Sequence, residues 1–211
     1  MPQRTEGTAA GLVPRDPTLP RLREAAAGCR ACELWEKGTQ TVFGAGAVPA
    51  PIMLVGEQPG DREDREGMPF VGPAGRLLDR ALQRAGIGRD LTYRTNVVKH
   101  FNWEPRGKRR IHRRPAAIHI RACRPWLDAE IEVVRPTVLV CLGATAAQAL
   151  LGPRFRLTEH RGAFVDSPLP PLVTATVHPS SILRADDDRA RHEAFDAFVR
   201  DLDAVARAIR G

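Results

Sequence analysis

The stretch PIMLVGEQPG, residues 51–60, decides the fold class of this chain. Its apolar run, residues 52–55, predicts a short strand buried on both faces, as the central strands of parallel sheets are. The run stops at Gly56, and a turn that carries Glu57 and Gln58 follows at once. Because open α/β sheets bind ligands beyond the carboxyl ends of their strands, this turn is a candidate site.

The same pattern recurs along the chain, where apolar strands alternate with helical segments. Further strands are predicted at 93–98, 137–142, 164–165 and 172–177, and helices at 21–27, 77–85, 116–134, 144–151 and 188–209. This alternation favours an α/β fold with a largely parallel sheet. Polar clusters also follow two of the later strands, at 96–100 and 178–181. Three clusters at strand ends predict one shared site.

Length and composition exclude several classes of protein. The chain has 211 residues, 43% of them hydrophobic and 27% charged, which excludes disorder over its whole length. The first 20 residues hold four Pro and predict a flexible tail before one domain at 21–211. No apolar run reaches the roughly 18–20 residues of a membrane helix and no signal peptide is visible, so a cytoplasmic protein is expected.

The charge of the chain favours an acidic partner. Its formal net charge is +7, which makes nucleic acid the first acidic partner to consider. A basic soluble protein without such a partner can have the same excess of Lys and Arg over Asp and Glu. Six of the nine residues at 106–114 are basic, and His112 lies among them. Such a run is usually a solvated loop, but it also suits phosphates. The surrounding cations disfavour the protonated imidazole, so His112 is expected to be a neutral nucleophile or base.

The cysteines indicate a metal centre. Cys29 and Cys32 form a C-x-x-C pair, and Cys123 and Cys141 are the other two cysteines. Disulfides are rare in cytosolic proteins, whereas two thiolates at this spacing can hold one metal centre.

Together these features resemble the iron–sulfur uracil-DNA glycosylases of family 4, over nearly all of the chain after residue 20. The resemblance rests on the order of the C-x-x-C pair, GEQPG at 56–60, PFVG at 69–72, TNVVK at 95–99, AC at 122–123, LGATA at 142–146 and HPS at 178–180. It implies a three-layer α/β/α fold with a central, mainly parallel sheet of roughly four strands. It also implies a [4Fe-4S] cluster.

Two departures from the family pattern narrow the resemblance. Gln58 stands where the family has Ala or Gly, and the segment containing KRRIH at 108–112 is longer than in the family. Both features resemble the UdgX subgroup, which cross-links itself to uracil-containing DNA.

A third departure concerns the cluster, because His100 stands where the family's third ligand is normally Cys. The resemblance therefore implies Cys29, Cys32, His100 and Cys123 as ligands, with imidazole replacing one thiolate as it does in Rieske centres. A set of four cysteines that includes Cys141 stays open, as does a zinc ion on the same residues.

The resemblance also assigns roles around a flipped-out uracil. Phe70 is expected to stack on the base, and Asn96 to hydrogen-bond its Watson–Crick edge. Gly56 helps to close the pocket, and His178 stabilises negative charge on the departing base.

The covalent step and the DNA contacts are assigned to other residues. His112 is the expected nucleophile toward C1′ of the sugar, with Glu57 and Gln58 in the catalytic group beside it. DNA contacts are expected from Lys108, Arg109, Arg110, Ser180, Ser181 and Arg184.

The expected function is excision of uracil from DNA, preferably single-stranded, by a uracil-DNA glycosylase that acts once and stays attached to the sugar. The expected protein is a monomer without membrane contact. Three other functions stay open: a conventional glycosylase that turns over in base excision repair, an iron–sulfur electron-transfer protein, and a non-catalytic basic DNA-binding module.

Overall fold

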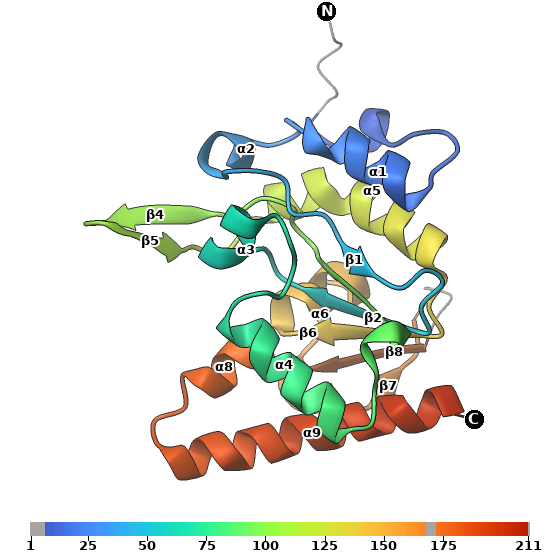
Figure 1. Cartoon of the computed structure of the whole chain (residues 1–211), viewed down its shortest axis with the longest axis vertical. Coiled ribbons are helices and arrows are strands. Elements are labelled where there is room, and N and C mark those ends of the chain that lie inside the picture. The colour runs from blue at the N-terminus through green and yellow to red at the C-terminus, as the bar shows by residue number, and fades with distance from the viewer. Residues whose placement is uncertain (1–6, 168–171, 211) are drawn as a thin grey trace, which may run out of the picture.

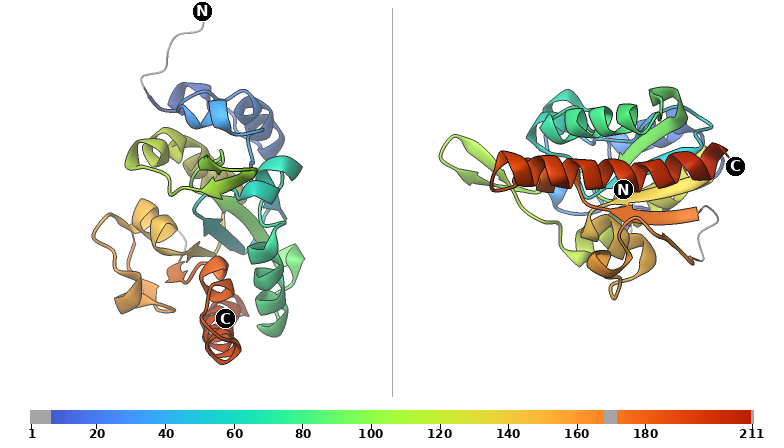
Figure 2. Two further views of the ribbon diagram at one scale, coloured as in Figure 1. Left: turned by 90° about the vertical axis from the view of Figure 1, so that its left-hand side faces the viewer. Right: turned by 90° about the horizontal axis from the view of Figure 1, so that it is seen from below.

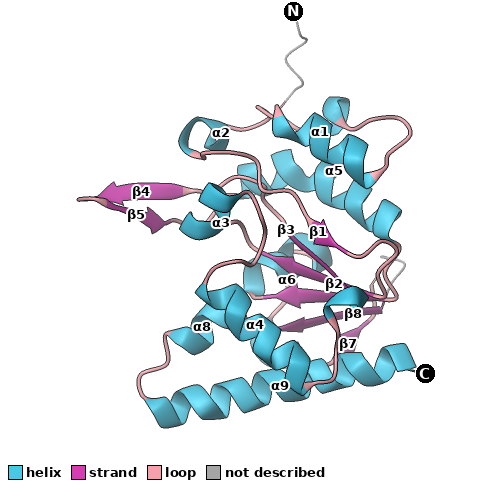
Figure 3. Cartoon of the chain, in the orientation of Figure 1, coloured by secondary structure: helices cyan, strands magenta, loops and turns pink. Residues whose placement is uncertain are grey.

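The computed structural model describes residues 7–167 and 172–210, which form one sheet covered by helices and a separate hairpin (Figure 1, Figure 3). The strands of the sheet, in spatial order, are β1 (Ala45–Gly46), β3 (Thr92–Asn96), β2 (Ile52–Gly56), β6 (Val138–Leu142), β8 (Leu172–Thr176) and β7 (Phe164–Val165). The four central strands are parallel, and the two edge strands are antiparallel to their neighbours. The predicted α/β fold is confirmed, and the short edge strands widen the expected sheet to six strands.

The helices connect and cover these strands. They are α1 (Leu19–Ala27), α2 (Leu34–Lys37), α3 (Asp61–Glu66), α4 (Pro73–Arg84), α5 (Ala117–Val134), α6 (Ala144–Leu151), α7 (Leu157–His160), α8 (Pro179–Leu183) and α9 (Asp188–Arg210), with the 3-10 helices η1 (Ala10–Leu12) and η2 (Arg89–Leu91). The short helices α3 and α8 follow strand-end turns and are absent from the sequence prediction.

Strand β2 shows how the sequence produces three layers. Its side chains alternate between the two faces of the sheet, as the two-residue period of a strand requires. Met53 and Val55 belong to an apolar cluster with Trp126 of α5. Ile52 and Leu54 belong to a second cluster, which includes residues of α4 and α9. The apolar run of β2 is therefore buried on both faces, and the left view of Figure 2 shows helices on either side of the sheet.

The register of the parallel strands brings their carboxyl ends to one edge. Gly56 pairs with Asn96, and Leu142 pairs with Thr176. The residues that follow these strands therefore lie side by side, which is where the sequence predicts the site.

A hairpin of two strands projects from this edge, clear of the sheet in Figure 1 and in the right view of Figure 2. It consists of β4 (Trp103–Arg106) and β5 (Arg109–His112). Its two-residue turn begins at Gly107, whose φ of +58° suits the Gly-first turn that matches the twist of a hairpin. The prediction of a loop here is wrong, since the basic side chains lie on a paired ribbon.

The N-terminal segment is docked from residue 7 onward. Ala9 is fully buried, and its N–H donates to the carbonyl of Ala122 in α5 at 2.9 Å. The predicted boundary at residue 20 falls inside α1, which begins at Leu19. The expected tail over residues 1–6 lies outside the described residues. In the described part of the chain, no helix is long and apolar enough to cross a membrane.

Candidate active site

A cleft of about 930 Å³ lies at the carboxyl edge of the sheet. Its walls come from the turns after β2 and β8, the ends of β3 and β6, the start of α6, and the hairpin. The predicted residues that line it are Glu57, Gln58, Phe70, Asn96, His112, His178, Ser180 and Arg184. The hairpin is what brings His112 to residues that the strands place.

At the floor of the cleft, Phe70 and Asn96 pack against Gly56 so closely that only glycine fits there. A Cβ on Gly56 would lie 2.4 Å from Asn96 Oδ1 and 2.8 Å from Phe70 Cζ. Asn96 is only 3% exposed, so its amide is held in place beside the Phe70 ring. An aromatic face beside an amide fits a planar base that carries both N–H and C=O groups.

Phe70 reaches this position through a strained backbone. Its φ is +58°, in the left-handed region that bulky residues seldom adopt. Its carbonyl oxygen would lie 1.8 Å from a Cβ at residue 75, so Gly75 is required in the first turn of α4. The Phe70 ring stacks toward His178, with ring centroids 6.3 Å apart and planes at 30°. Strain of this kind is held where the position of a side chain matters for function.

His178 is a neutral donor with a defined tautomer. The backbone N–H of Ser180 donates to its Nδ1 at 3.2 Å, and an N–H cannot accept, so the ring proton sits on Nε2. Burial, and then the neighbouring His112 and Arg184, lower the pKa of His178 to about 4. At neutral pH its Nε2–H can therefore hydrogen-bond an oxygen in the cleft without carrying charge.

His112 and Glu57 form a pair at the mouth of the cleft. His112 Nε2 lies 3.3 Å from Glu57 Oε1, and the imidazole is half-exposed. The pKa of His112 is lowered mainly by burial, with Glu57 opposing the shift and Arg184 adding to it. The neutral imidazole predicted from the sequence is thus supported, but for another reason. Partial burial and Arg184 lower its pKa, rather than the cations of its own segment.

A family model described as the uracil DNA glycosylase superfamily matches residues 43–203, which contain the whole sheet and the cleft. The chain belongs to the uracil DNA glycosylase superfamily. It is similar to the Type-4 uracil-DNA glycosylase of Thermotoga maritima, with 37% identity over 174 residues that cover 82% of this chain and 87% of the relative. The Type-4 uracil-DNA glycosylase of Sulfurisphaera tokodaii is 36% identical over 176 residues, which cover 79% of this chain and 76% of the relative. The Type-4 uracil-DNA glycosylase of Pyrobaculum aerophilum is 34% identical over 173 residues, which cover 79% of this chain and 85% of the relative.

In this superfamily member, the side chain of Gln58 bonds to the hairpin. It is buried, and Nε2 donates to the carbonyls of Asn102 at 3.1 Å and Arg113 at 3.0 Å. Its Oε1 accepts from the backbone N–H of Asn102 at 3.3 Å. Asn102 precedes β4 and Arg113 follows β5, so one amide bridges both ends of the hairpin. These bonds support a positioning role for Gln58, and its expected catalytic role stays a prediction.

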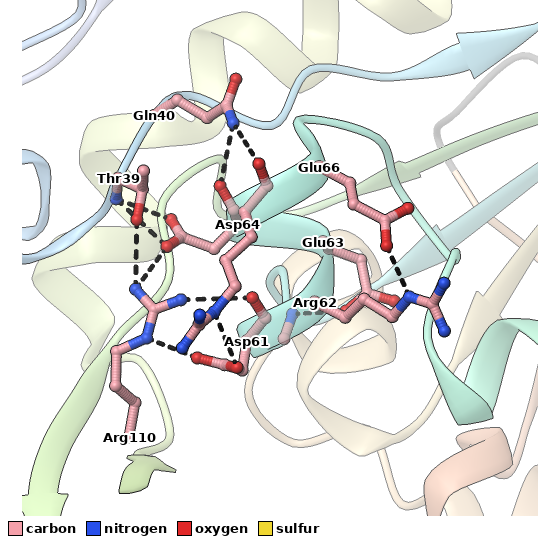
Figure 4. Close-up of polar contacts among 10 residues, drawn as sticks. Thr39, Gln40, Asp61, Arg62, Glu63, Asp64, Glu66 and Arg110 are labelled. Atoms are coloured by element: carbon pink, nitrogen blue, oxygen red, sulfur yellow. Dashed lines mark hydrogen bonds and ion pairs between the residues drawn. The ribbon is translucent and has the colours of Figure 1, made fainter. Parts of the chain in front are cut away.

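Arg110 is the second anchor of the hairpin, and it points into the protein (Figure 4). Its guanidinium donates to Asp64 Oδ2 at 2.6 Å and to Thr39 Oγ1 at 3.2 Å, and it forms an ion pair with Asp61. Asp64 is fully buried and accepts from the N–H of Thr39 at 2.9 Å. The DNA contact expected of Arg110 is replaced by this internal clamp between β5 and α3.

The other predicted DNA contacts face outward or line the rim. Lys108 and Arg109 are exposed at the tip of the hairpin. Arg184 lines the cleft, and Ser181 Oγ donates to the carbonyl of His178 at 2.8 Å. Ser180 is turned toward His178 Nδ1, with its Oγ at 2.8 Å, so it also orients that imidazole.

All four cysteines pack on the face of the sheet covered by α1 and α5. Burial raises the pKa of Cys123 to about 12, and the neighbouring thiols of Cys32 and Cys29 contribute to the shift. Cys123 Sγ accepts from the N–H of Lys99 at 3.4 Å. Cys141, in β6, differs from these three because burial alone raises the pKa of its thiol to about 12, and no neighbouring thiol contributes.

His100 has a buried ring nitrogen without a partner. Its Nε2 lies 3.0 Å from Thr41 Oγ1, while its buried Nδ1 has no hydrogen-bond partner among the described residues. Such a nitrogen can act as a metal ligand, and the choice between His100 and Cys141 stays a prediction. Within residues 7–167 and 172–210, no group of three or more His, Cys, Asp or Glu is placed to hold a single metal ion.

The structure adds three residues that sequence reasoning missed. Asp61 and Asp64 receive Arg110, and their spacing of three on a short helix is a signal that could have paired them. Thr145 donates a hydrogen bond to Glu57 Oε2. It follows the end of β6, so the strand-end rule applied to all four central strands would have found it.

Proposed function

We propose that this protein removes uracil from DNA and then bonds His112 to the sugar that loses its base. Uracil excision is supported by membership of the superfamily and by the Type-4 relatives. The covalent step is carried by one observation: an imidazole paired with Glu57 lines the same cleft as Phe70 and Asn96.

Base recognition uses the floor of the cleft. Phe70 stacks on the uracil ring, and the Asn96 amide complements its N3–H and O4. Gly56 leaves the room that this requires. As the bond between C1′ and N1 breaks, uracil leaves with the electron pair, and negative charge develops on O2. The Nε2–H of His178 stabilises that charge in a site already arranged for it.

The covalent step follows at the electron-poor C1′. The ring nitrogen of His112 that does not face Glu57 donates its lone pair and forms the N–C1′ bond. The nitrogen that faces Glu57 gives its proton to the carboxylate, so the attached imidazole ends neutral. Glu57 later returns this proton to solvent, from which the uracil anion takes one. His112 captures C1′ before water does, and the protein stays attached.

A conventional glycosylase is the second candidate, and the similarity to Type-4 uracil-DNA glycosylases favours it. In that case water takes the place of His112 at C1′ and the protein turns over. The two candidates are separated by mixing the protein with uracil-containing single-stranded DNA and running a denaturing gel. A slowly migrating protein–DNA band supports the covalent function, and abasic DNA without such a band supports the conventional one.

The pH dependence of adduct formation reports the state of His112. Because its pKa is lowered, the nucleophile stays neutral below the ordinary histidine pKa of about 6.5. We expect the single-turnover rate to change less than about twofold between pH 7.5 and 6, where an unshifted histidine gives about a fourfold loss. Glu57 raises the His112 pKa, so Glu57→Gln should move the midpoint still lower. A wild-type midpoint at 6.5 or above contradicts this.

We propose that Cys29, Cys32, Cys123 and the Nδ1 of His100 hold a [4Fe-4S] cluster. Three neighbouring thiols and one orphaned buried imidazole nitrogen fit the donors that such clusters use. When bound, the cluster supplies a cross-link between the C-x-x-C loop, α5 and the end of β3. None of these four residues lines the cleft, so the cluster would contribute to the structure rather than to the reaction.

The visible spectrum tests this ligand set against the set of four cysteines. We expect a brown protein, a colourless Cys123→Ser variant and a brown Cys141→Ser variant. The two cysteines form a matched pair, because both are buried and burial raises both pKa values to about 12. Loss of colour in Cys141→Ser, with colour kept in Cys123→Ser, overturns the assignment.

We propose that Lys108, Arg109 and Arg184 contact phosphates on either side of the uracil. Lys108 and Arg109 are exposed on the hairpin, and Arg184 lines the cleft. A single strand is the preferred substrate because its base enters the cleft without the cost of unpairing, and a monomer suffices for these contacts.

A further inference from the structure

The carboxylate of Glu57 is held from two sides. Its Oε1 faces His112 Nε2 at 3.3 Å, and its Oε2 accepts a hydrogen bond from Thr145 Oγ1. Thr145 is buried, lies in the first turn of α6 and lines the cleft. The three side chains therefore form a chain of contacts, hydroxyl to carboxylate to imidazole.

The hydroxyl is well placed to fix the carboxylate. A glutamate on a turn has several rotamers, and one contact with a half-exposed imidazole does not select among them. Thr145 is β-branched and helical, so its χ1 is restricted. The helix is itself tied down, since the N–H of Gly143 donates to the carbonyl of Thr176 in β8 at 2.8 Å.

Helix α6 also holds the chain that follows the nucleophile. Gln148, one turn beyond Thr145, accepts from Arg114 Nη2 at 3.2 Å. At the start of the helix, a Cβ on Gly143 would lie 3.0 Å from His178 Cβ. One helix thus contacts Glu57, His178 and the exit of the hairpin, and it can set their positions relative to each other.

We propose that Thr145 is a positioning residue for the reaction of His112, a role that rests on the proposed function. Its hydroxyl holds the Glu57 carboxylate so that Oε1 faces the imidazole and receives its proton when the N–C1′ bond forms. Removing the hydroxyl leaves base recognition intact, because Gly56, Phe70, Asn96 and His178 are untouched. It changes what happens to C1′ afterwards, because a poorly oriented His112 competes less well with water.

The test measures how the DNA that has lost its uracil is divided between the covalent adduct and free abasic DNA. Thr145→Val keeps the shape and removes the hydroxyl, and Thr145→Ser keeps the hydroxyl. We expect the ratio of adduct to abasic DNA to fall by about tenfold in Thr145→Val and to return to within about twofold of wild type in Thr145→Ser. Uracil release under single-turnover conditions should change little in either variant.

Thr174→Val is the matched control. Thr174 is also buried, and its hydroxyl donates to the carbonyl of Ala163 at 2.9 Å, on β8 away from Glu57. We expect its ratio of adduct to abasic DNA to equal that of wild type, because its hydroxyl contacts no residue of the reaction.

The failures of the two proposals are distinguishable. If the wild-type protein forms no adduct, the proposed covalent function fails whatever the variants do. If the wild type forms adduct and Thr145→Val gives the same ratio of adduct to abasic DNA, the role of Thr145 is overturned and the covalent function stands. A parallel loss of adduct and uracil release, or no rescue by Thr145→Ser, also overturns the role, since either result indicates packing.

Discussion

Replacing His112 by Ser is expected to abolish the denaturant-stable adduct and to give an enzyme that releases more than one uracil per protein molecule. Serine removes the imidazole and leaves space for water beside C1′. The residues that recognise the base and stabilise its departure, Phe70, Asn96 and His178, are unchanged, so bond cleavage continues. A denaturing gel measures the adduct, and uracil released under excess DNA measures the turnover.

The control for this substitution is His192→Ser. His192 is exposed on α9, and its Nδ1 contacts the carbonyl of Asp188, away from the cleft. This variant should cross-link as the wild type does. Mass spectrometry of the digested wild-type adduct should place the DNA fragment on the peptide that contains His112. A DNA fragment on any other peptide, or an adduct formed by His112→Ser, would contradict the assignment of His112 as the nucleophile.

Substitutions of the neighbouring residues Arg110 and Arg109 by Met should affect different properties, the rate of adduct formation for Arg110 and the binding of DNA for Arg109. Arg110 is clamped to Asp61 and Asp64 inside the protein, whereas Arg109 is exposed. We expect Arg110→Met to lower adduct formation at saturating DNA by tenfold or more, roughly the cost of a misplaced reacting group. We expect Arg109→Met to leave that rate unchanged but to weaken binding and reduce the salt slope by about one.

The expected loss in Arg110→Met follows from the carboxylate that this substitution leaves without its partner. Without Arg110, the buried carboxylate of Asp64 loses its ion pair, at a cost of about 3–5 kcal/mol that moving the hairpin away would relieve. The double variant Arg110→Met with Asp64→Asn removes that charge, so it reports on the hairpin without the penalty. Binding of an uncleavable uracil analogue at several salt concentrations supplies the other readout. Equal effects of Arg109→Met and Arg110→Met on both measurements would contradict the assignment.

The central sheet and the location of the site were predictable because they depend on local patterns. The apolar run of residues 52–55 indicates a doubly buried strand, and β2 has that burial. Asn96 ends one parallel strand, and Glu57 and His178 follow two others, so topology alone brings them to one edge. Those predictions required no knowledge of which side chains touch.

The hairpin was not predictable by the same means. Its strands have no continuous buried face, and β4 contains Pro105, which strand patterns disfavour. Arg109 and Arg110 are adjacent and chemically identical, and only the position of α3 turns one inward. Gln58 carries no sequence signal that it bonds to backbone groups rather than to substrate. These features depend on tertiary contacts between segments that are distant in the chain.

The hairpin forms a sheet of its own, of two strands, in the described part of the chain. Its length can therefore vary without shifting the register of any strand in the main sheet. It behaves as a removable module, attached by Gln58, by the aspartates of α3 and by Gln148. A protein engineer could transplant it to another member of the superfamily by supplying those attachment points together with Glu57. If His112 traps DNA as proposed, a glycosylase that already has those attachment points and Glu57 would gain self-trapping through a single insertion.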